Sequence, residues 1–379
     1  MQGKSLRMAI RASASALVVG VAGQAGAVEL SAGDYSAELY GYARLNAVYD
    51  IDEDISLSTR SGSFGAINVG AAEDDEVTGH FSADAVQTRL GVRTTTPEGV
   101  KVVVEGDFRP GTLRLRHGYG EYKGVLLGQT WSNFGSFVGN TAVLDFDAQP
   151  GVAGLQGRIS QARYTTGPLS VSLEEPITSF LAGPDTVDGK QSLPTFTARV
   201  EDSAGGLSYS GAVLAQQVEY DTGTADDSVI GFGAFVAGQM AVTDTLTIQG
   251  TVSYTDGANA YLYRSGEDFG AEDAYVDGSG DLESIAGYGG SLGAGFDLGG
   301  GRSVNVAYGI VTVDWDDAED DGLAVAGKSE TNQAIMANYQ WTPVKNVTMG
   351  VEYAYLEREN VSGDDGDASR IMFAGQYNF

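Results

Sequence analysis

The feature that most constrains this chain is a period-two alternation of apolar and polar residues, which recurs in sixteen segments. In the first segment, Leu45 and Tyr49 fall on one face and Arg44 on the other, the pattern of a β-strand between two different environments. The segments are 35–51, 86–95, 100–108, 113–122, 125–131, 158–165, 169–174, 194–201, 207–216, 229–240, 245–254, 285–297, 303–313, 330–341, 347–358 and 370–379. No run of 18 consecutive apolar residues follows residue 27, so ordinary transmembrane helices are not expected.

The connections between these segments alternate in length. The short ones are 96–99, 123–124, 167–168, 202–206, 241–244, 298–302 and 342–346; the long ones are 52–84, 132–157, 175–193, 217–228, 255–284, 314–329 and 359–368, with 109–112 as a brief exception. Short turns on one rim, long loops on the other and an even strand number describe a bacterial outer-membrane barrel, whose closure pairs every backbone group in lipid. The sequence therefore predicts an all-β fold: a transmembrane antiparallel β-barrel of about 16 strands, with short periplasmic turns and long extracellular loops.

The last segment, Arg370–Phe379, is predicted to close this barrel against the first one. It alternates throughout and ends on an aromatic residue, which resembles the C-terminal signature of bacterial outer-membrane β-barrels. Tyr377 and Phe379 are expected to face lipid near the periplasmic rim and to serve closure and assembly.

The first 27 residues have the pattern of a cleaved secretory signal peptide. Lys4, Arg7 and Arg11 precede a short run of small and apolar residues, and Ala25-Gly26-Ala27 fits a cleavage site. Residues 28–379 are then expected to form one barrel domain in the bacterial outer membrane. The chain contains no cysteine, so no disulfide framework is expected.

Acidic residues dominate the charge of the chain, with 51 Asp and Glu against 22 Lys and Arg and a net charge of −29. This balance excludes nucleic acid as an expected partner, because phosphates are recognised by basic surfaces. The acidic loops are expected to keep an extracellular face hydrated. The expected partners of the barrel itself are outer-membrane lipid and lipopolysaccharide.

A barrel of sixteen strands leaves an aqueous channel, whereas eight strands would be filled by side chains. The expected function is therefore passive diffusion of small hydrophilic solutes. Such a channel needs a constriction, which in trimeric porins comes from a loop folded inward. The connection 132–157, which carries Asp145 and Asp147, is the predicted constriction loop.

Seven arginines in the first half of the chain fall on faces that are predicted to line the lumen: Arg44, Arg89, Arg93, Arg114, Arg116, Arg163 and Arg199. Basic side chains along a pore favour anions, both by coulombic attraction and by bidentate contact with carboxylates. The alternative is that these arginines pair with Glu105, Asp107, Glu201 and acids of the loops, which would leave little net field.

Several motifs resemble the DcaP-like porins of Gram-negative bacteria. They are GQTWSNF at 128–134, LDF at 144–146, LYGY with Arg44-Leu45 at 39–45 and LRLRHGYGEY at 113–122, so the clear matches cover about residues 38–146. The resemblance implies a trimer of sixteen-stranded channels for small organic anions, dicarboxylates among them, with Arg114 and Arg116 as leading candidates for the anion path. Members can carry an N-terminal coiled coil, but no heptad pattern fits between Ala27 and the first strand.

Two other functions stay open: a non-selective or cation-tolerant general porin, and a structural or adhesive barrel with acidic cation-binding loops. No catalytic residue, metal site or cofactor is predicted. His80 falls in an acidic loop, and His117 falls on the face of Leu113 and Leu115, which is expected to meet lipid or a neighbouring subunit. Within the run 314–322, the residues from Asp317 loosely resemble the start of a calcium loop, but the twelfth position counted from Asp317 is Lys328 instead of Glu. The glycine cluster 287–295 is interpreted as ordinary barrel-wall glycine.

Overall fold

A computed structural model describes residues 28–379 except 33–34, 59–60, 110, 146 and 183–188. The predicted signal peptide, residues 1–27, lies outside the described residues. Among the residues that are described, no helix combines the length and the apolar character needed to cross a membrane.

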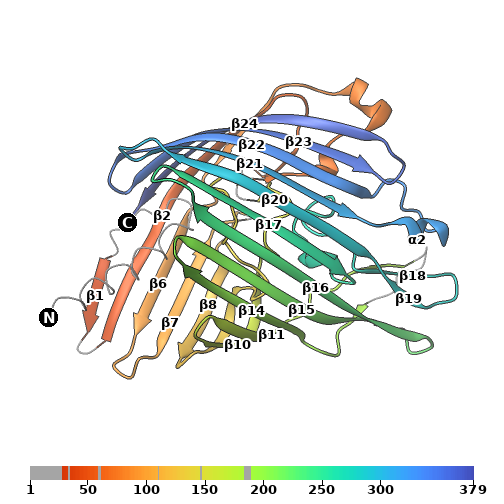
Figure 1. Ribbon diagram of the computed structural model, residues 1–379, viewed down its shortest axis with the longest axis horizontal. Helices are drawn as coiled ribbons and strands as arrows, with labels where there is room; N and C mark the ends of the chain where they lie inside the picture. Colours follow the sequence, from red (N-terminus) through yellow and green to blue (C-terminus); the bar gives the residue numbers. More distant parts are fainter. Residues whose placement is uncertain (1–27, 33–34, 59–60, 110, 146, 183–188) are drawn as a thin grey trace.

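Sixteen antiparallel strands, with β5 and β6 counted as one, form a closed barrel, as predicted (Figure 1). They are β2 (Tyr35–Asp50), β5 (His80–Asp84) with β6 (Arg89–Thr95), β7 (Lys101–Asp107), β8 (Arg114–Tyr122), β9 (Val125–Trp131), β10 (Arg158–Thr166), β11 (Leu169–Glu174), β14 (Thr195–Ala204), β15 (Leu207–Asp221), β16 (Asp226–Ala241), β17 (Leu246–Asp256), β20 (Ala286–Asp297), β21 (Arg302–Val313), β22 (Ser329–Val344), β23 (Val347–Asn360) and β24 (Asp365–Asn378). The short strand β1 (Val28–Ala32) pairs antiparallel with residues 35–39 at the start of β2.

The outward-facing side chains of the strands are mainly apolar and exposed, and many of the inward-facing side chains are polar and buried. On β17, Val252 is 71% exposed on the outer face, whereas Thr251 and Ser253 on the inner face are 5% and 4% exposed. This is the reverse of a soluble protein, whose apolar side chains gather inside. It is the arrangement that a lipid exterior and a polar interior require.

The first and last strands close the barrel in the predicted way. Ala47 of β2 stands opposite Phe373 of β24, and Asp50 stands opposite Arg370. The ladder continues to the end of the chain, where the Phe379 N–H donates to the Gly41 carbonyl at 3.1 Å. Tyr377 and Phe379 are exposed, by 56% and 37%.

Several strands extend further into the extracellular loops than the alternation predicts. β15 and β16 stay paired up to Asp221 opposite Asp226, and β24 begins at Asp365 instead of Arg370. The loop predicted at 52–84 is also shorter, because His80 begins β5, which pairs with the upper part of β2. Above the membrane both faces meet water, so backbone pairing continues there without an apolar face to reveal it.

The long loops carry short elements of their own. The loop after β2 contains β3 (Ser56–Ser58), β4 (Ser61–Gly62), η1 (Phe64–Ala66) and η2 (Gly70–Asp75); the others contain β12 (Phe180–Leu181), β13 (Gly189–Lys190), η3 (Asn259–Tyr261), β18 (Ala274–Val276), β19 (Leu282–Ser284) and α2 (Asp316–Asp320). β12, β18 and β19 form a small separate sheet from two loops that are distant in sequence.

Candidate functional site

Residues 132–157, here called the inner segment, lie against the inner wall of the barrel. Its first contacts lie close to β9, the strand that precedes it. There the Asn133 N–H donates to Glu174 of β11 and the Ser136 hydroxyl donates to Glu201 of β14, both at 2.6 Å. They continue around the wall, where the Gln249 side chain of β17 donates to Thr141 at 3.2 Å. The inner segment therefore crosses from β11 to the far side of the barrel.

Glycines on the far wall provide room for the inner segment. A Cβ placed on Gly293 of β20 would overlap Thr141, and one on Gly309 of β21 would overlap the Pro150 carbonyl. The glycines of β20 and β21 thus have a more specific role than the ordinary wall glycine that the sequence indicated. The clustering of glycine on neighbouring strands was the available sign that another backbone approaches there.

The tip of the inner segment is bound by a buried carboxylate of β23. The Glu352 side chain is 1% exposed and accepts the Leu144 and Asp145 N–H groups, each at 2.7 Å. It also accepts the Asn338 side-chain amide at 2.8 Å. The sequence offered no sign of this role, since Glu352 is one acid among 51.

The two acids of the predicted constriction loop are buried. Asp145 is 1% exposed and accepts Arg370 at 3.0 Å, and Asp147 is 4% exposed and pairs with Arg109 at 3.1 Å. Asp147 also accepts the Tyr263 hydroxyl at 3.2 Å. Asp145 therefore joins the loop to the wall strand β24, and Asp147 joins it to the connections that carry Arg109 and Tyr263.

All seven predicted arginines extend from inward faces of the wall, and at least five of them stand within 4.0 Å of a carboxylate. The pairs are Arg89 with Glu105 at 4.0 Å, Arg93 with Glu38 at 3.2 Å, Arg114 with Asp107 at 2.6 Å, Arg116 with Glu105 at 3.0 Å and with Asp107 at 2.9 Å, and Arg199 with Glu201 at 3.7 Å. Arg44 donates to Asn46 at 2.8 Å and to the Leu144 carbonyl at 3.2 Å, and Arg163 donates to Gln161 at 2.7 Å. The charges on these faces are mostly paired.

A β-bulge on β8 corrects the predicted orientation of His117. The register shifts between Glu105 and Gly106 of β7, so that Arg116 and His117 both turn inward. His117 Nδ1 lies 2.9 Å from the Thr130 hydroxyl, and the residue is 9% exposed. Strict alternation fails here because one extra residue reverses the phase of the strand.

Aromatic side chains accompany the cations on this wall. The Arg93 guanidinium lies 4.7 Å from the centre of the Tyr40 ring, and that of Arg89 lies 5.2 Å from the centre of the Tyr42 ring. The alternation of the first strand already placed both tyrosines on the face of Arg44, but it did not show their stacking with the cations of β6.

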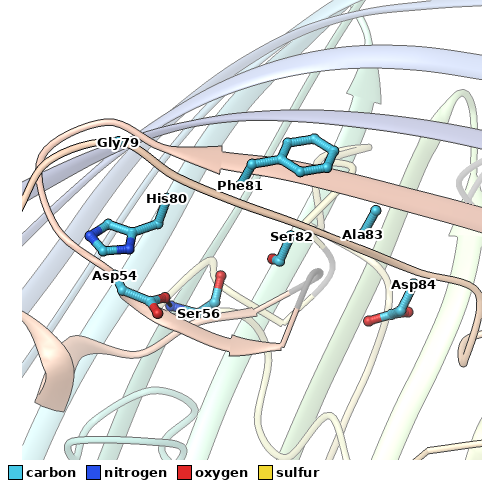
Figure 2. A pocket seen from close by; sticks show the side chains of 8 residues that line it. All are labelled: Asp54, Ser56, Gly79, His80, Phe81, Ser82, Ala83 and Asp84. Carbon is cyan, nitrogen blue, oxygen red and sulfur yellow. Dashed lines mark hydrogen bonds between the residues drawn. The ribbon is translucent and has the colours of Figure 1, made fainter.

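A polar hollow of about 540 Å³ lies beside β5 in the extracellular half (Figure 2). Figure 2 shows Ser82 and Asp84 on the same side of β5 as Asp54 and Ser56, with Phe81 on the opposite side. Because Ser82 stands opposite the buried Val48 of β2, this side faces inward. The mouth of the barrel is therefore acidic at the level of Asp54 and Asp84.

The comparisons with known proteins agree with this geometry. The model of the DcaP outer membrane protein family matches residues 23–379. The DcaP channel of Acinetobacter baumannii is similar, with 28% identity, a TM-score of 0.79 and coverage of 92% of this chain and 99% of that one. The anion-selective porin of Comamonas acidovorans has 14% identity and a TM-score of 0.57, with 91% of this chain and 100% of that one covered.

A Salmonella typhi OmpF structure with daunomycin has 12% identity and a TM-score of 0.55, with 93% of this chain and 100% of that one covered. These last two likenesses concern the fold alone. No curated protein sequence matches the chain. The family match over almost the whole chain and the closed sixteen-stranded barrel lead to one conclusion: the protein belongs to the DcaP outer membrane protein family, a family of outer-membrane porin channels.

Proposed function

We propose that the protein is a passive diffusion channel for small hydrophilic solutes that favours small organic anions, dicarboxylates among them. One observation carries this proposal: the inner segment follows the wall from β11 to β24 and reaches Arg44 of β2, and five of the seven arginines stand on the wall from β6 to β10. Arg93 and Arg114 are accessible, with side chains that are 45% and 38% exposed. A solute that passes the inner segment would therefore travel beside these cations.

The ion pairs weaken anion binding without removing it. Arg114 donates to Asp107 from Nε and Nη2. Since a guanidinium carries five N–H donors, the Nη1 group stays available for a solute carboxylate. A bound anion shares Arg114 with Asp107, and such weak binding is what conduction needs, because a solute must leave as readily as it enters.

Arg116 has a supporting role in this proposal. Its side chain is 1% exposed and donates to both Glu105 and Asp107. It therefore acts through those carboxylates, whose charge it offsets, in place of contact with the solute. Removing it would leave two carboxylates in the wall without their shared partner.

The reversal potential of single channels in a salt gradient tests the anion preference. We expect the sign of an anion-preferring channel, and we expect Arg114→Ala to lower that preference. Arg302→Ala is the matched control, because it removes the same charge at the exposed first residue of β21. A clear cation preference of the unmodified channel would refute the proposal.

A channel without charge preference is the second candidate, and the ion pairs of the lumen arginines favour it. In that case Arg114→Ala and Arg302→Ala would give the same reversal potential near zero. A structural or adhesive barrel would instead show no solute-dependent conductance at all.

The setting of the channel is part of the proposal. We infer that residues 1–27 are removed on export, that residues 28–379 assemble as a homotrimer in contact with outer-membrane lipid and lipopolysaccharide, and that the inner segment is the constriction. Mass spectrometry of the purified protein should give an N-terminus at Val28, and unheated gel samples should run as trimers. A retained N-terminal segment or a monomer would contradict these points separately.

A further inference from the structure

Three segments that are far apart in sequence meet at one residue, Gly62. The Gly62 N–H donates to Asp145 of the inner segment at 3.3 Å. The Gly62 carbonyl accepts the Arg264 guanidinium from the loop between β17 and β20. Gly62 itself belongs to the loop between β2 and β5, so its two backbone groups join one loop to two others.

Arg264 binds two extracellular loops to each other: the loop between β2 and β5, which carries Gly62, and the loop between β17 and β20, which carries Arg264 itself. These are the two outer loops. Arg264 is fully buried, and its guanidinium also donates to the Asp268 carbonyl within its own loop. The guanidinium carbon lies 5.0 Å from the centre of the Phe64 ring and 5.3 Å from that of Phe269, so an aromatic ring from each loop encloses the cation. Alongside, the Gly65 N–H donates to the Glu267 carbonyl at 2.8 Å.

The other end of this chain of contacts is fixed to the wall. Asp145 accepts Arg370 of β24 at 3.0 Å, and Arg370 donates in turn to Asp50 of β2 at 2.9 Å. The guanidinium of Arg370 also donates to Ser56 of the first outer loop at 2.9 Å. Asp145 therefore contacts Arg370 of the wall on one side and Gly62 of the outer loops on the other.

A second contact joins the same loops independently of Gly62. The Tyr263 hydroxyl donates to Asp147, and the Gly151 N–H donates to the Tyr263 carbonyl, both at 3.2 Å. In each contact, a buried polar group of one loop is satisfied by another loop. Separation of the loops would leave these groups unpaired, so they are expected to keep their positions together.

We propose that Arg264 is a positioning residue that couples the two outer loops to the inner segment. Its contacts at the mouth of the barrel keep the inner segment, which narrows the channel, in place. This inference rests on the proposed role of the inner segment as the constriction. Arg264 is fully buried, and its effect is transmitted through Gly62 and Asp145.

Single-channel recording of Arg264→Met in the full chain tests this coupling. We expect a several-fold rise in the frequency of current steps and sub-conductance levels, because the inner segment loses its outer support. Arg358→Met is the matched control: Arg358 is also a buried arginine near the mouth, but it donates to Gly327 of a different loop. The control should leave the current steps unchanged, and an equal rise in both variants would overturn the proposal.

A reversible lock supplies a second readout within one sample. Because the chain has no cysteine, Ser63→Cys with Asp268→Cys introduces a single possible disulfide between the two outer loops, at a place where the two side chains lie 2.9 Å apart. In the Arg264→Met background, oxidation should abolish the extra current steps and reduction should restore them. Should Arg264→Met fail to fold, the same cysteine pair in the otherwise unmodified chain must show fewer current steps when oxidised than when reduced. Identical recordings in the two states would refute the coupling.

Glu352→Ala separates this inference from the proposed function, since it releases the inner segment directly. If Glu352→Ala leaves the conductance unchanged, the inner segment is not the constriction. If Glu352→Ala changes the conductance and Arg264→Met does not, the constriction stands and only the coupling fails.

Discussion

Replacing Glu352 by alanine removes the anchor of the inner segment at its tip. Both carboxylate oxygens are in use, accepting two backbone N–H groups at 2.7 Å and the Asn338 amide at 2.8 Å. The variant leaves the two backbone donors without this partner in a site where Glu352 is 1% exposed, while the Asn338 amide keeps its bond to the Ala142 carbonyl at 2.8 Å.

The size of the effect follows from the number and kind of these bonds. A hydrogen bond to a charged group contributes about 1.5–3 kcal/mol, and removal of one partner from a buried charged group costs about 3–5 kcal/mol. Water from the lumen can solvate part of the exposed site, so we take the lower end, about 3 kcal/mol. Since about 1.4 kcal/mol is a factor of ten, the open state of the tip should become roughly 100-fold more populated.

Hydrogen exchange measured by mass spectrometry reports this directly on the Leu144 and Asp145 amides, which should exchange roughly 100-fold faster in the variant. Glu201→Gln is the control, because Glu201 accepts only the Ser136 hydroxyl from the inner segment and its side chain is 38% exposed. If the two amides keep their protection in Glu352→Ala, the carboxylate does not hold the tip, and the account of the inner segment given above is wrong.

Three further outcomes are expected. Gly309→Val should displace the inner segment, because its side chain would overlap the Pro150 carbonyl, and should raise single-channel conductance; Gly278→Val, at a site with open space, should leave conductance as it is. Deletion of Phe379 should lower the amount of heat-resistant folded barrel, since it removes the last backbone bonds to Gly41, while the channels that do assemble keep their conductance. Asp273, which lies outside the strands, is fully buried, and burial raises its pKa to about 7 against the opposing backbone N–H bonds of Ala260 and Ser179. Its folded pKa is above the unfolded value of about 3.9, so its contribution to stability is present at low pH and is lost as pH rises through about 7. Protection factors in the loop before β20, which are exchange rates corrected for the intrinsic pH dependence of amide exchange, should therefore be higher at about pH 5 than at about pH 8, and Asp273→Asn should flatten that difference; an unchanged profile of protection factors in the variant would assign the effect to another group.

The sequence alone determined the barrel. Alternation at period two can be read from neighbouring residues, because each strand places successive side chains in lipid and in the lumen. The same rule placed Arg44 and Arg114 on inward faces and paired the last strand with the first, since a closed barrel leaves no other position for Arg370–Phe379.

The tertiary structure alone decided what these inward groups do. The bulge that turns His117 inward depends on the pairing of β8 with β7, and no local pattern marks it. The carboxylates that pair with the arginines come from neighbouring strands. The sequence therefore indicated the pairing of these arginines, and the loss of net positive charge that it causes, only as an alternative. Glu352, Gly62 and Arg264 gained their roles from contacts with segments that are about 200 residues away in sequence. Such contacts depend on which loops fold back into the barrel, and period-two alternation describes the wall of the barrel and not its contents.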